Sequence, residues 1–259
     1  MQHSLFRITG FAVFLSVLFL NAFVDLGHKI IIQNTVFKTY DGSEQVILTA
    51  IVNALILLPF ILLFTPSGYV SDKFPKNKVM RVSAWAALLI TLMITMSYYQ
   101  GWFWVSFALT FLLAIQSAMY SPAKYGFIRE IVGEKHLAEG NGMVQAITMV
   151  AILSGTFFFS IFFEKMLHNS GITEKADLLQ TIAPLGWMLV ALTILELFFT
   201  YRLPQKSETD ENMLFDWKKY RTGKTQRGIL SSVKNNQFIW LSIIGLSVFW
   251  AVAQVILAA

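Results

Sequence analysis

Apolar residues gather into seven blocks of about 20 residues along this chain of 259 residues. A helix of about 20 residues crosses the roughly 30 Å hydrocarbon core of a bilayer, whereas the strands of a membrane barrel are about half as long and alternate in polarity. The pattern therefore predicts an all-α polytopic membrane protein. The predicted spans are Ile8–Ile32, Val46–Phe64, Val79–Tyr99, Trp102–Tyr120, Gly142–Phe163, Thr181–Tyr201 and Phe238–Ala259.

Composition supports this fold class. The chain is 56% hydrophobic and only 14% charged, whereas soluble domains carry about 25% charged residues. The first block follows Arg7 as a signal peptide would, but it is too long and has no small-residue cleavage site before Asn21, so we expect a retained helix. The chain has no cysteine, which excludes disulfides and thiolate metal sites within it.

Basic residues are distributed unequally between the two sets of alternating loops. Sixteen of the 20 Lys and Arg residues fall on one side, which predicts a cytoplasmic N-terminus by the positive-inside rule. The net charge of +5 then reflects topology and contact with anionic lipid, and it implies no nucleic-acid partner. The four basic residues on the other side are Lys29, Lys38, Lys165 and Lys175.

The polar stretch before the last block divides the chain. We predict a six-helix bundle over residues 1–203, a cytoplasmic linker over 204–236, and the first helix of a second bundle over 237–259. For Met213–Tyr220, which mixes aromatic and basic residues, a helix on the headgroup layer and a solvated linker both remain open. Because the last block stops at Ala259 with no polar residue to end the helix, we expect the sequence to be incomplete.

The stretch GYVSDKFPKNKVMR, residues 68–81, lies between the second and third blocks. Gly68 would let two helix backbones approach, and Asp72 could cap a helix or pair with a base. The stretch resembles the signature loop of the major facilitator superfamily, with Pro75 where that family often has Gly. The resemblance implies a loop that closes the cytoplasmic gate; an ordinary basic loop is the alternative. The predicted gating residues are Gly68, Asp72, Lys73, Lys76 and Lys78.

A second motif, YSPAKYGFIREIV, begins at Tyr120. Ser121 and Pro122 are expected to end the fourth span, because proline lacks a backbone donor and disfavours helical geometry in the residue before it. Lys124 would then lie at the cytoplasmic mouth, where its ammonium could meet a phosphate or an internal carboxylate.

SPAKYG, together with NAFVD on the first span and LAEGNGMVQAITMVAILSG on the fifth, resembles the bacterial lysophospholipid transporter (LplT) family, a branch of the major facilitator superfamily. The resemblance implies a twelve-helix flippase of the cell inner membrane that moves lysophospholipids such as lyso-phosphatidylethanolamine inward for phospholipid remodelling. It implies an acyltransferase partner, which in some bacteria is fused to the transporter. A fused transporter–acyltransferase and an exporter of amphiphilic drugs are the alternatives.

The segment NAFVDLGHKI brings ionisable residues into the first span. On a helix, Asn21, Asp25 and His28 share a face, and Lys29 follows Asp25 at i+4. Charged residues in a span usually face the protein interior or water. We therefore predict a substrate-binding role for this stripe, with an ion pair at the outer interface as the alternative. The family resemblance ties Asp25 to transport, although Leu26 stands where that family commonly has Asn. Lys29 and His28 would pair with Asp25, bind a phosphate, or mark the outer mouth.

The fifth and sixth spans carry further polar candidates. Asn141 and Gln145 share a face and either line a polar cavity or bond to a neighbouring helix. Small residues recur every fourth position, which predicts close helix packing: Ala138, Gly142 and Ala146, then Ala151 and Gly155. For Glu196, near the end of the sixth span, we favour snorkelling to the inner interface.

The sequence shows no chemistry typical of an enzyme. His136 and His168 have no partners at metal-ligand spacing, and phosphate-binding glycine loops, nucleophile elbows and acyltransferase His-x4-Asp patterns are missing from these residues. We therefore predict no cofactor and no metal, and a transporter rather than an enzyme for this chain.

Overall fold

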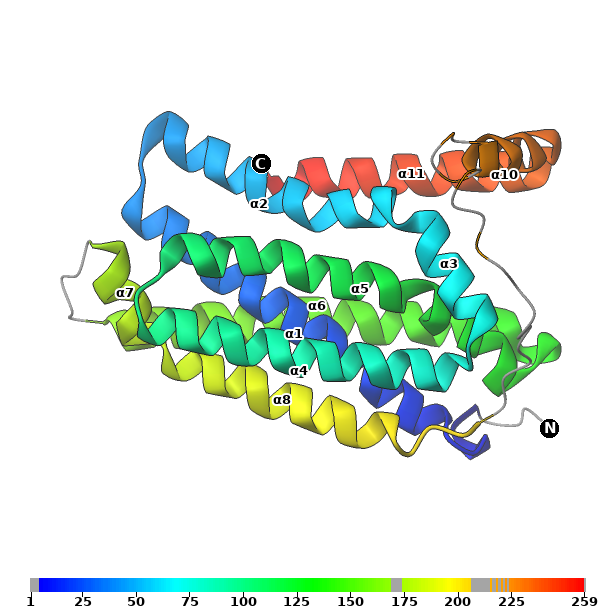
Figure 1. The fold of residues 1–259 in the computed structure, drawn as a ribbon, viewed down its shortest axis with the longest axis horizontal. Coiled ribbons are helices and arrows are strands. Elements are labelled where there is room, and N and C mark those ends of the chain that lie inside the picture. The colour runs from blue at the N-terminus through cyan, green and yellow to red at the C-terminus, as the bar shows by residue number, and fades with distance from the viewer. Residues whose placement is uncertain are drawn as a thin grey trace. The chain divides into compact units, whose positions relative to one another are not determined.

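The computed structural model describes residues 5–168, 174–205, 215, 218, 220, 222 and 224–258. Every regular element in these ranges is helical, which confirms the all-α prediction (Figure 1). The first unit contains η1 (Leu5–Arg7), α1 (Phe11–Thr39), α2 (Gly42–Leu62), α3 (Phe64–Lys73), α4 (Lys76–Tyr99), α5 (Phe103–Val132), η2 (Glu134–His136), α6 (Leu137–Leu167), α7 (Lys175–Ile182) and α8 (Pro184–Thr200).

The chain separates into two units, Met1–Met213 and Leu214–Ala259. In the second unit, α10 (Lys224–Asn235) lies within the predicted linker, and α11 (Gln237–Ala258) occupies the seventh apolar block. Most of Met213–Tyr220 lies outside the described residues. The proposed division into bundle, linker and second bundle therefore stays a prediction.

Helix α1 is the centre of the first unit, where it packs against α6, α8 and α5. Helix α4 packs against α5 and α8, and α2 packs against α5. Among the described residues, five helical segments are long and apolar enough to span a bilayer, and the pair α7 and α8 makes a sixth. Five of the predicted spans are thereby confirmed as single helices of spanning length, and the sixth corresponds to a bent pair of helices.

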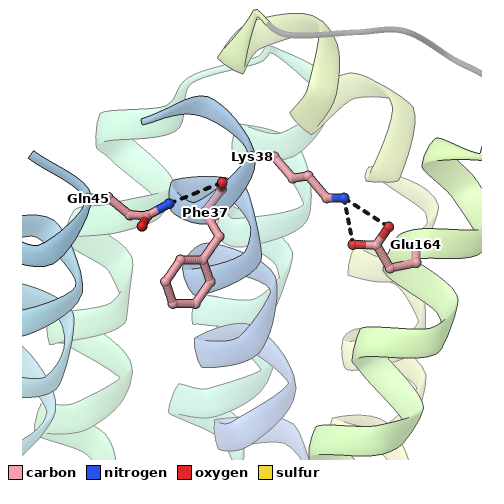
Figure 2. Close-up of polar contacts among 4 residues, drawn as sticks. All are labelled: Phe37, Lys38, Gln45 and Glu164. Atoms are coloured by element: carbon pink, nitrogen blue, oxygen red, sulfur yellow. Dashed lines mark hydrogen bonds and ion pairs between the residues drawn. The ribbon is translucent and has the colours of Figure 1, made fainter. Parts of the chain in front are cut away.

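The α1–α2 connection is short, since only Tyr40 and Asp41 separate the two helices, and Gln45 of α2 reaches back to the end of α1 (Figure 2). The side-chain amide of Gln45 donates to the backbone oxygens of Phe37, at 3.3 Å, and Tyr40, at 2.9 Å. These bonds occupy carbonyls at the C-terminus of α1 that have no partner within the helix. At the same end of the bundle, Lys38 on α1 forms an exposed ion pair of 2.9 Å with Glu164 on α6.

At the other end of the bundle, the segments that carry many of the basic residues lie close together. Gly10, before α1, is so close to Pro204, after α8, that a Cβ on Gly10 would lie 2.5 Å from the proline Cδ and 3.9 Å from Ile131 of α5. The guanidinium of Arg81 on α4 stacks on the ring of Tyr201, 4.2 Å from its centroid. The basic loop ends of α1, α4, α5 and α8 therefore meet at one end of the unit, as the alternating topology requires.

The expected end of the fourth span at Ser121 and Pro122 is wrong. Helix α5 continues through Pro122 to Val132 and stops at Gly133, whose positive φ of 73° is readily available only to glycine. The residues after the proline are buried, and Phe127 packs edge-on against Phe14 of α1 with ring centroids 5.3 Å apart. Membrane helices tolerate proline where neighbouring groups satisfy the freed backbone.

The sixth span is broken where the sequence indicated one helix. Helices α7 and α8 meet at Ala183 with a bend of 48°. Pro184 is the first residue of α8, a position that suits its fixed φ and its missing N–H group. A Cβ on Gly186 would lie 2.9 Å from the Cα of Thr95, so the start of α8 packs directly on α4.

The predicted signature loop is mostly helical. Helix α3 extends through Asp72 to Lys73, and α4 begins at Lys76, so only Phe74 and Pro75 separate them. Pro75 precedes the first turn of α4, and its carbonyl accepts the backbone N–H of Val79 at 3.0 Å. This short and stiff connection positions the lysines of the motif at fixed points of two helices.

The packing of α1 on α6 depends on a glycine. A Cβ on Gly27 would lie 2.4 Å from the ring of Phe159, which is fully buried. Helix α1 therefore approaches α6 as closely as small residues permit. Gly155 also faces α1, but a Cβ there would be in ordinary contact with Phe23 at 3.4 Å, so the packing at this point leaves room for a methyl group.

We predict that Gly27→Ala lowers the stability of the bundle by about 1–3 kcal/mol, because the added methyl group overpacks a filled core. Thermal unfolding in detergent, followed by circular dichroism, measures this effect. Gly142→Ala on α6 is the matched control, because a Cβ there meets nothing within 4 Å. Equal melting temperatures for the two variants would contradict the close α1–α6 contact.

Candidate functional site

The centre of the candidate site is a contact between α1 and α5. The hydroxyl of Ser117 donates a hydrogen bond of 2.5 Å to Oδ2 of Asp25. The same hydroxyl lies 3.2 Å from Oε1 of the neighbouring Gln116. Asp25 is half-buried, so its carboxylate is held between helices without being sealed from its surroundings. Asp25 therefore faces a neighbouring helix of the bundle, as expected of an ionisable residue in a span.

Glu196 of α8 faces the same place. Its side chain is 1% exposed, and neither carboxylate oxygen has a hydrogen-bond partner among the described residues. Glu196 interacts electrostatically with Asp25, and Asn21 is a neighbouring polar side chain on α1. Snorkelling of Glu196 to the interface is therefore wrong. The acid lies on the face of α8 that packs against α1, whereas Arg202 stacks on Phe198 at 4.7 Å from its ring centroid.

Two more buried polar atoms belong to this region. The hydroxyl of Tyr120 and Nε2 of Gln116 are buried without hydrogen-bond partners in the described part of the chain. Tyr120 interacts electrostatically with both acids. We call the resulting set of side chains the polar cluster: Asn21, Asp25, Gln116, Ser117, Tyr120 and Glu196.

Acidic side chains outnumber basic ones at the polar cluster. Within the described part of the chain, Lys124 of α5 interacts electrostatically with Asp25, whereas no lysine does so with Glu196. Lys124 also lies over the ring of Tyr125, with its ammonium 4.9 Å from the centroid. Two acids thus face one base. Buried polar groups are nearly always hydrogen-bonded, and ionisable groups in spans mark pathways for ions or substrates. The cluster is therefore suited to receive a polar or cationic group.

His28 lies away from the polar cluster, although it shares the predicted stripe. It is fully buried, with Nδ1 2.7 Å from the hydroxyl of Tyr98 on α4 and Nε2 3.1 Å from the hydroxyl of Thr110 on α5. The imidazole thus joins three helices. The alternative in which Lys29 pairs with Asp25 is wrong, because no ion pair links these two residues. Lys29 is half-buried on α1.

The amides predicted on the fifth span do not join the polar cluster. Asn141 and Gln145 are exposed on α6. The first ridge of small residues shares this exposure, since Ala138, Gly142 and Ala146 are uncovered in the described bundle. Only the second ridge, which contains Ala151 and Gly155, packs against α1. The exposed half of α6 is therefore available to a partner surface or to an aqueous path.

The two sequence motifs meet at an ion pair. Nζ of Lys76 lies 2.6 Å from Oε1 of Glu130, and both side chains are mostly buried. The aliphatic part of the Lys76 side chain passes over Gly126, where an added Cβ would lie 2.5 Å from the lysine Cε. The glycine of SPAKYG thus makes room for a lysine of the signature segment. This contact fixes the start of α4 on the end of α5.

The remaining gating residues are arranged differently. Asp72 is exposed and has no hydrogen bond or ion pair within the described ranges, whereas Lys73 donates to the hydroxyl of Tyr69 at 3.0 Å. Lys78 is exposed. The expected close backbone approach at Gly68 is not present, because nothing lies within 4 Å of an added Cβ.

Sequence reasoning missed Ser117 and Tyr120. A signal was available, since Ser117, Tyr120 and Lys124 follow one another at i, i+3 and i+7 and so share a face of α5. Because the helix was expected to end at Ser121, Lys124 was not placed on the same helix face as Ser117 and Tyr120. In the described residues, no group of three or more His, Asp or Glu side chains is arranged to hold a metal ion.

The sequence of this chain matches a known protein family. The profile of the Major Facilitator Superfamily matches residues 8–259. The chain belongs to the major facilitator superfamily. This superfamily consists of membrane transporters, and the spanning helices of the bundle agree with that membership.

Curated relatives of this superfamily member are named lysophospholipid transporters. The chain is 34% identical over 117 residues to "Lysophospholipid transporter LplT" of Photorhabdus laumondii, a match that covers 45% of this chain and 26% of the relative. The proteins of the same name from Serratia proteamaculans and Yersinia enterocolitica are 34% identical over 119 residues, with the same coverage. Each match thus spans about a quarter of the relative's length.

We predict that His28→Ala destabilises the bundle strongly, because the hydroxyls of Tyr98 and Thr110 each lose a partner. A buried polar group without its partner costs about 1–3 kcal/mol. Chemical unfolding in detergent measures the loss. Lys29→Ala is the control on the same helix, and we expect it to leave stability within about 0.5 kcal/mol. Wild-type stability of His28→Ala would contradict a structural role for the imidazole.

Proposed function

We propose that this protein moves lysophospholipids, such as lyso-phosphatidylethanolamine, across the bacterial cytoplasmic membrane by alternating access. The polar cluster carries the proposal, because it places two acids and a nearby lysine inside an apolar bundle. The similarity to proteins named lysophospholipid transporters supports the substrate class.

The chemistry of the cluster suits a zwitterionic headgroup. An ammonium group would be attracted by Asp25 and Glu196, and it would supply donors to the unpartnered oxygens of Glu196. A phosphate would be attracted by Lys124, which lies seven residues and about 10 Å along α5 from Ser117. We propose Asn21, Asp25 and Glu196 as ligands of the ammonium and Lys124 as the ligand of the phosphate.

Alternating access requires a second bundle that rocks against the first. The exposed amides of Asn141 and Gln145 on α6 support such a partner, because polar side chains at membrane depth are stable only against protein or water. We propose that this face of α6 meets the second bundle or the pathway between the bundles. His28 and Lys29 then act from the outer half of α1, with His28 holding the helix and Lys29 near the mouth.

The gate and the orientation follow from the basic end of the bundle. We propose that this end is cytoplasmic, with the N-terminus, in accordance with the positive-inside rule. Asp72 of α3 is exposed without a described partner, and we propose that it contacts the second bundle when the gate is closed. The pair of Lys76 and Glu130 holds the gate segment on α5 throughout.

A lysolipid delivered to the cytoplasmic leaflet is a substrate for reacylation. We propose an acyltransferase partner, either a separate protein or a domain fused to this chain. The complete reading frame distinguishes these two arrangements.

Uptake of labelled lyso-phosphatidylethanolamine into spheroplasts that carry the full-length protein tests the transport function. We predict that Asp25→Asn and Glu196→Gln each lower the initial rate about tenfold or more, since interactions with charged groups contribute about 1.5–3 kcal/mol. Glu164→Gln, which removes an exposed acid near the C-terminal end of α6, should leave the rate unchanged.

Two results would count against this function. Wild-type uptake by both acid variants would remove the polar cluster from the transport pathway. Transport of a cationic dye without transport of lysolipid would favour a drug exporter of the same superfamily. Expression at the membrane is measured in parallel, so that a loss of protein is not taken for a loss of transport.

A further inference from the structure

A groove lies between α3, α4 and α5, next to the polar cluster, with which it shares Gln116. Its volume is about 480 Å³, and its walls are mainly apolar, with Phe74, Val79, Val82, Ile90, Leu112 and Met119 among the lining residues. Lys78 lies at the end of the groove beside the α3–α4 connection. An open apolar groove with one cation at its end has the polarity of a lipid rather than of a soluble metabolite.

The dimensions of the groove fit one alkyl chain. The lining residues on α4 extend from Lys78 to Ile90, which is about 18 Å at 1.5 Å per residue. One leaflet of the hydrocarbon core is about 15 Å thick. A groove of this length can cover one alkyl chain over the depth of one leaflet.

The ammonium of Lys78 is available to a ligand. Neighbouring lysines of the signature segment are already engaged, because Lys76 pairs with Glu130 and Lys73 donates to Tyr69. Lys78 is exposed, and it has no ion pair with a carboxylate of the described residues. A lysine ammonium binds phosphate as a point charge.

Gln116 connects the groove to the interior. Its side chain is 5% exposed, lines the groove and leaves Nε2 without a described partner, while Oε1 lies 3.2 Å from the hydroxyl of Ser117. Ser117 in turn donates to Asp25. A molecule in the groove would therefore contact a side chain that belongs to the polar cluster.

We infer that this groove binds one acyl chain of an anionic phospholipid of the surrounding membrane, with the lipid phosphate at Lys78. The net negative charge of the headgroup complements the free ammonium, and the apolar walls cover the chain. This site differs from the proposed transport site, because its ligand is a resident lipid and Lys78 is not part of the polar cluster, although the two sites share Gln116.

Native mass spectrometry of the full-length protein in detergent tests the site, with phosphatidylglycerol and phosphatidylethanolamine added separately at equal concentration. We expect one tightly held phosphatidylglycerol. Its affinity should fall about fivefold in Lys78→Ala, as for the loss of one basic contact to an anionic lipid, and should be retained in Lys78→Arg. Ala86→Phe, which fills the groove, should remove this lipid.

Two matched control variants test whether the effect on lipid binding is specific to the groove. Lys135→Ala removes an exposed lysine elsewhere, and Val150→Phe adds the same bulk to an exposed position of α6; neither should change binding. Melting temperatures confirm that each variant is folded. Retention of the lipid by Ala86→Phe would overturn the groove as its site, and retention of full affinity by Lys78→Ala would overturn the headgroup assignment.

Two further outcomes would replace the lipid by another occupant. Displacement of the bound lipid by millimolar inorganic phosphate would indicate a site for free anions. A dimer in gel filtration that Ala86→Phe converts to a monomer would indicate an interface between two copies of the chain. Either result would overturn the proposal.

Discussion

The burial of Glu196 beside Asp25 is the constraint around which the bundle is built. An acid that is 1% exposed, with no partner for either oxygen among the described residues, is costly in an apolar bundle. The surrounding elements limit this cost: Ser117 donates to Asp25, Lys124 supplies a positive charge, and Asn21 adds a polar neighbour. These groups come from α1, α5 and α8, so the positions of three helices are tied to one polar site.

Close packing keeps those helices in place. Gly27 lets α1 lie directly on Phe159 of α6, and Gly186 lets α8 lie on Thr95 of α4. His28 joins α1 to α4 and α5 through buried hydrogen bonds. The ion pair of Lys76 and Glu130 then fixes the start of α4 on α5 at the basic end. Rigid contacts thus surround a cluster whose own polar atoms are incompletely satisfied, as expected of a site that receives a ligand.

Much of the fold could be predicted from the sequence, because span length and apolar composition are local properties. The break at Ala183 and the continuation of α5 through Pro122 could not, since each depends on what neighbouring helices cover. The polar face of α1 was predictable from periodicity, but periodicity does not identify the neighbour. Asn21 and Asp25 therefore face Glu196, while His28, on the same stripe, bonds to Tyr98. Glu196 was misplaced for the same reason, because its spacing from Arg202 suggested an interfacial position.

Accessibility at the polar cluster tests the central claim most directly, namely that a polar substrate reaches Asp25. These 259 residues contain no cysteine, so a single thiol can be introduced without background from them. We predict that Ser117→Cys in the full-length protein reacts with a small water-soluble thiol reagent and that lyso-phosphatidylethanolamine slows this reaction. Ser106→Cys, at a fully buried position of the same helix, should stay unreactive. Equal reactivity at the two positions, or no protection of Ser117→Cys by the lysolipid, would contradict the account.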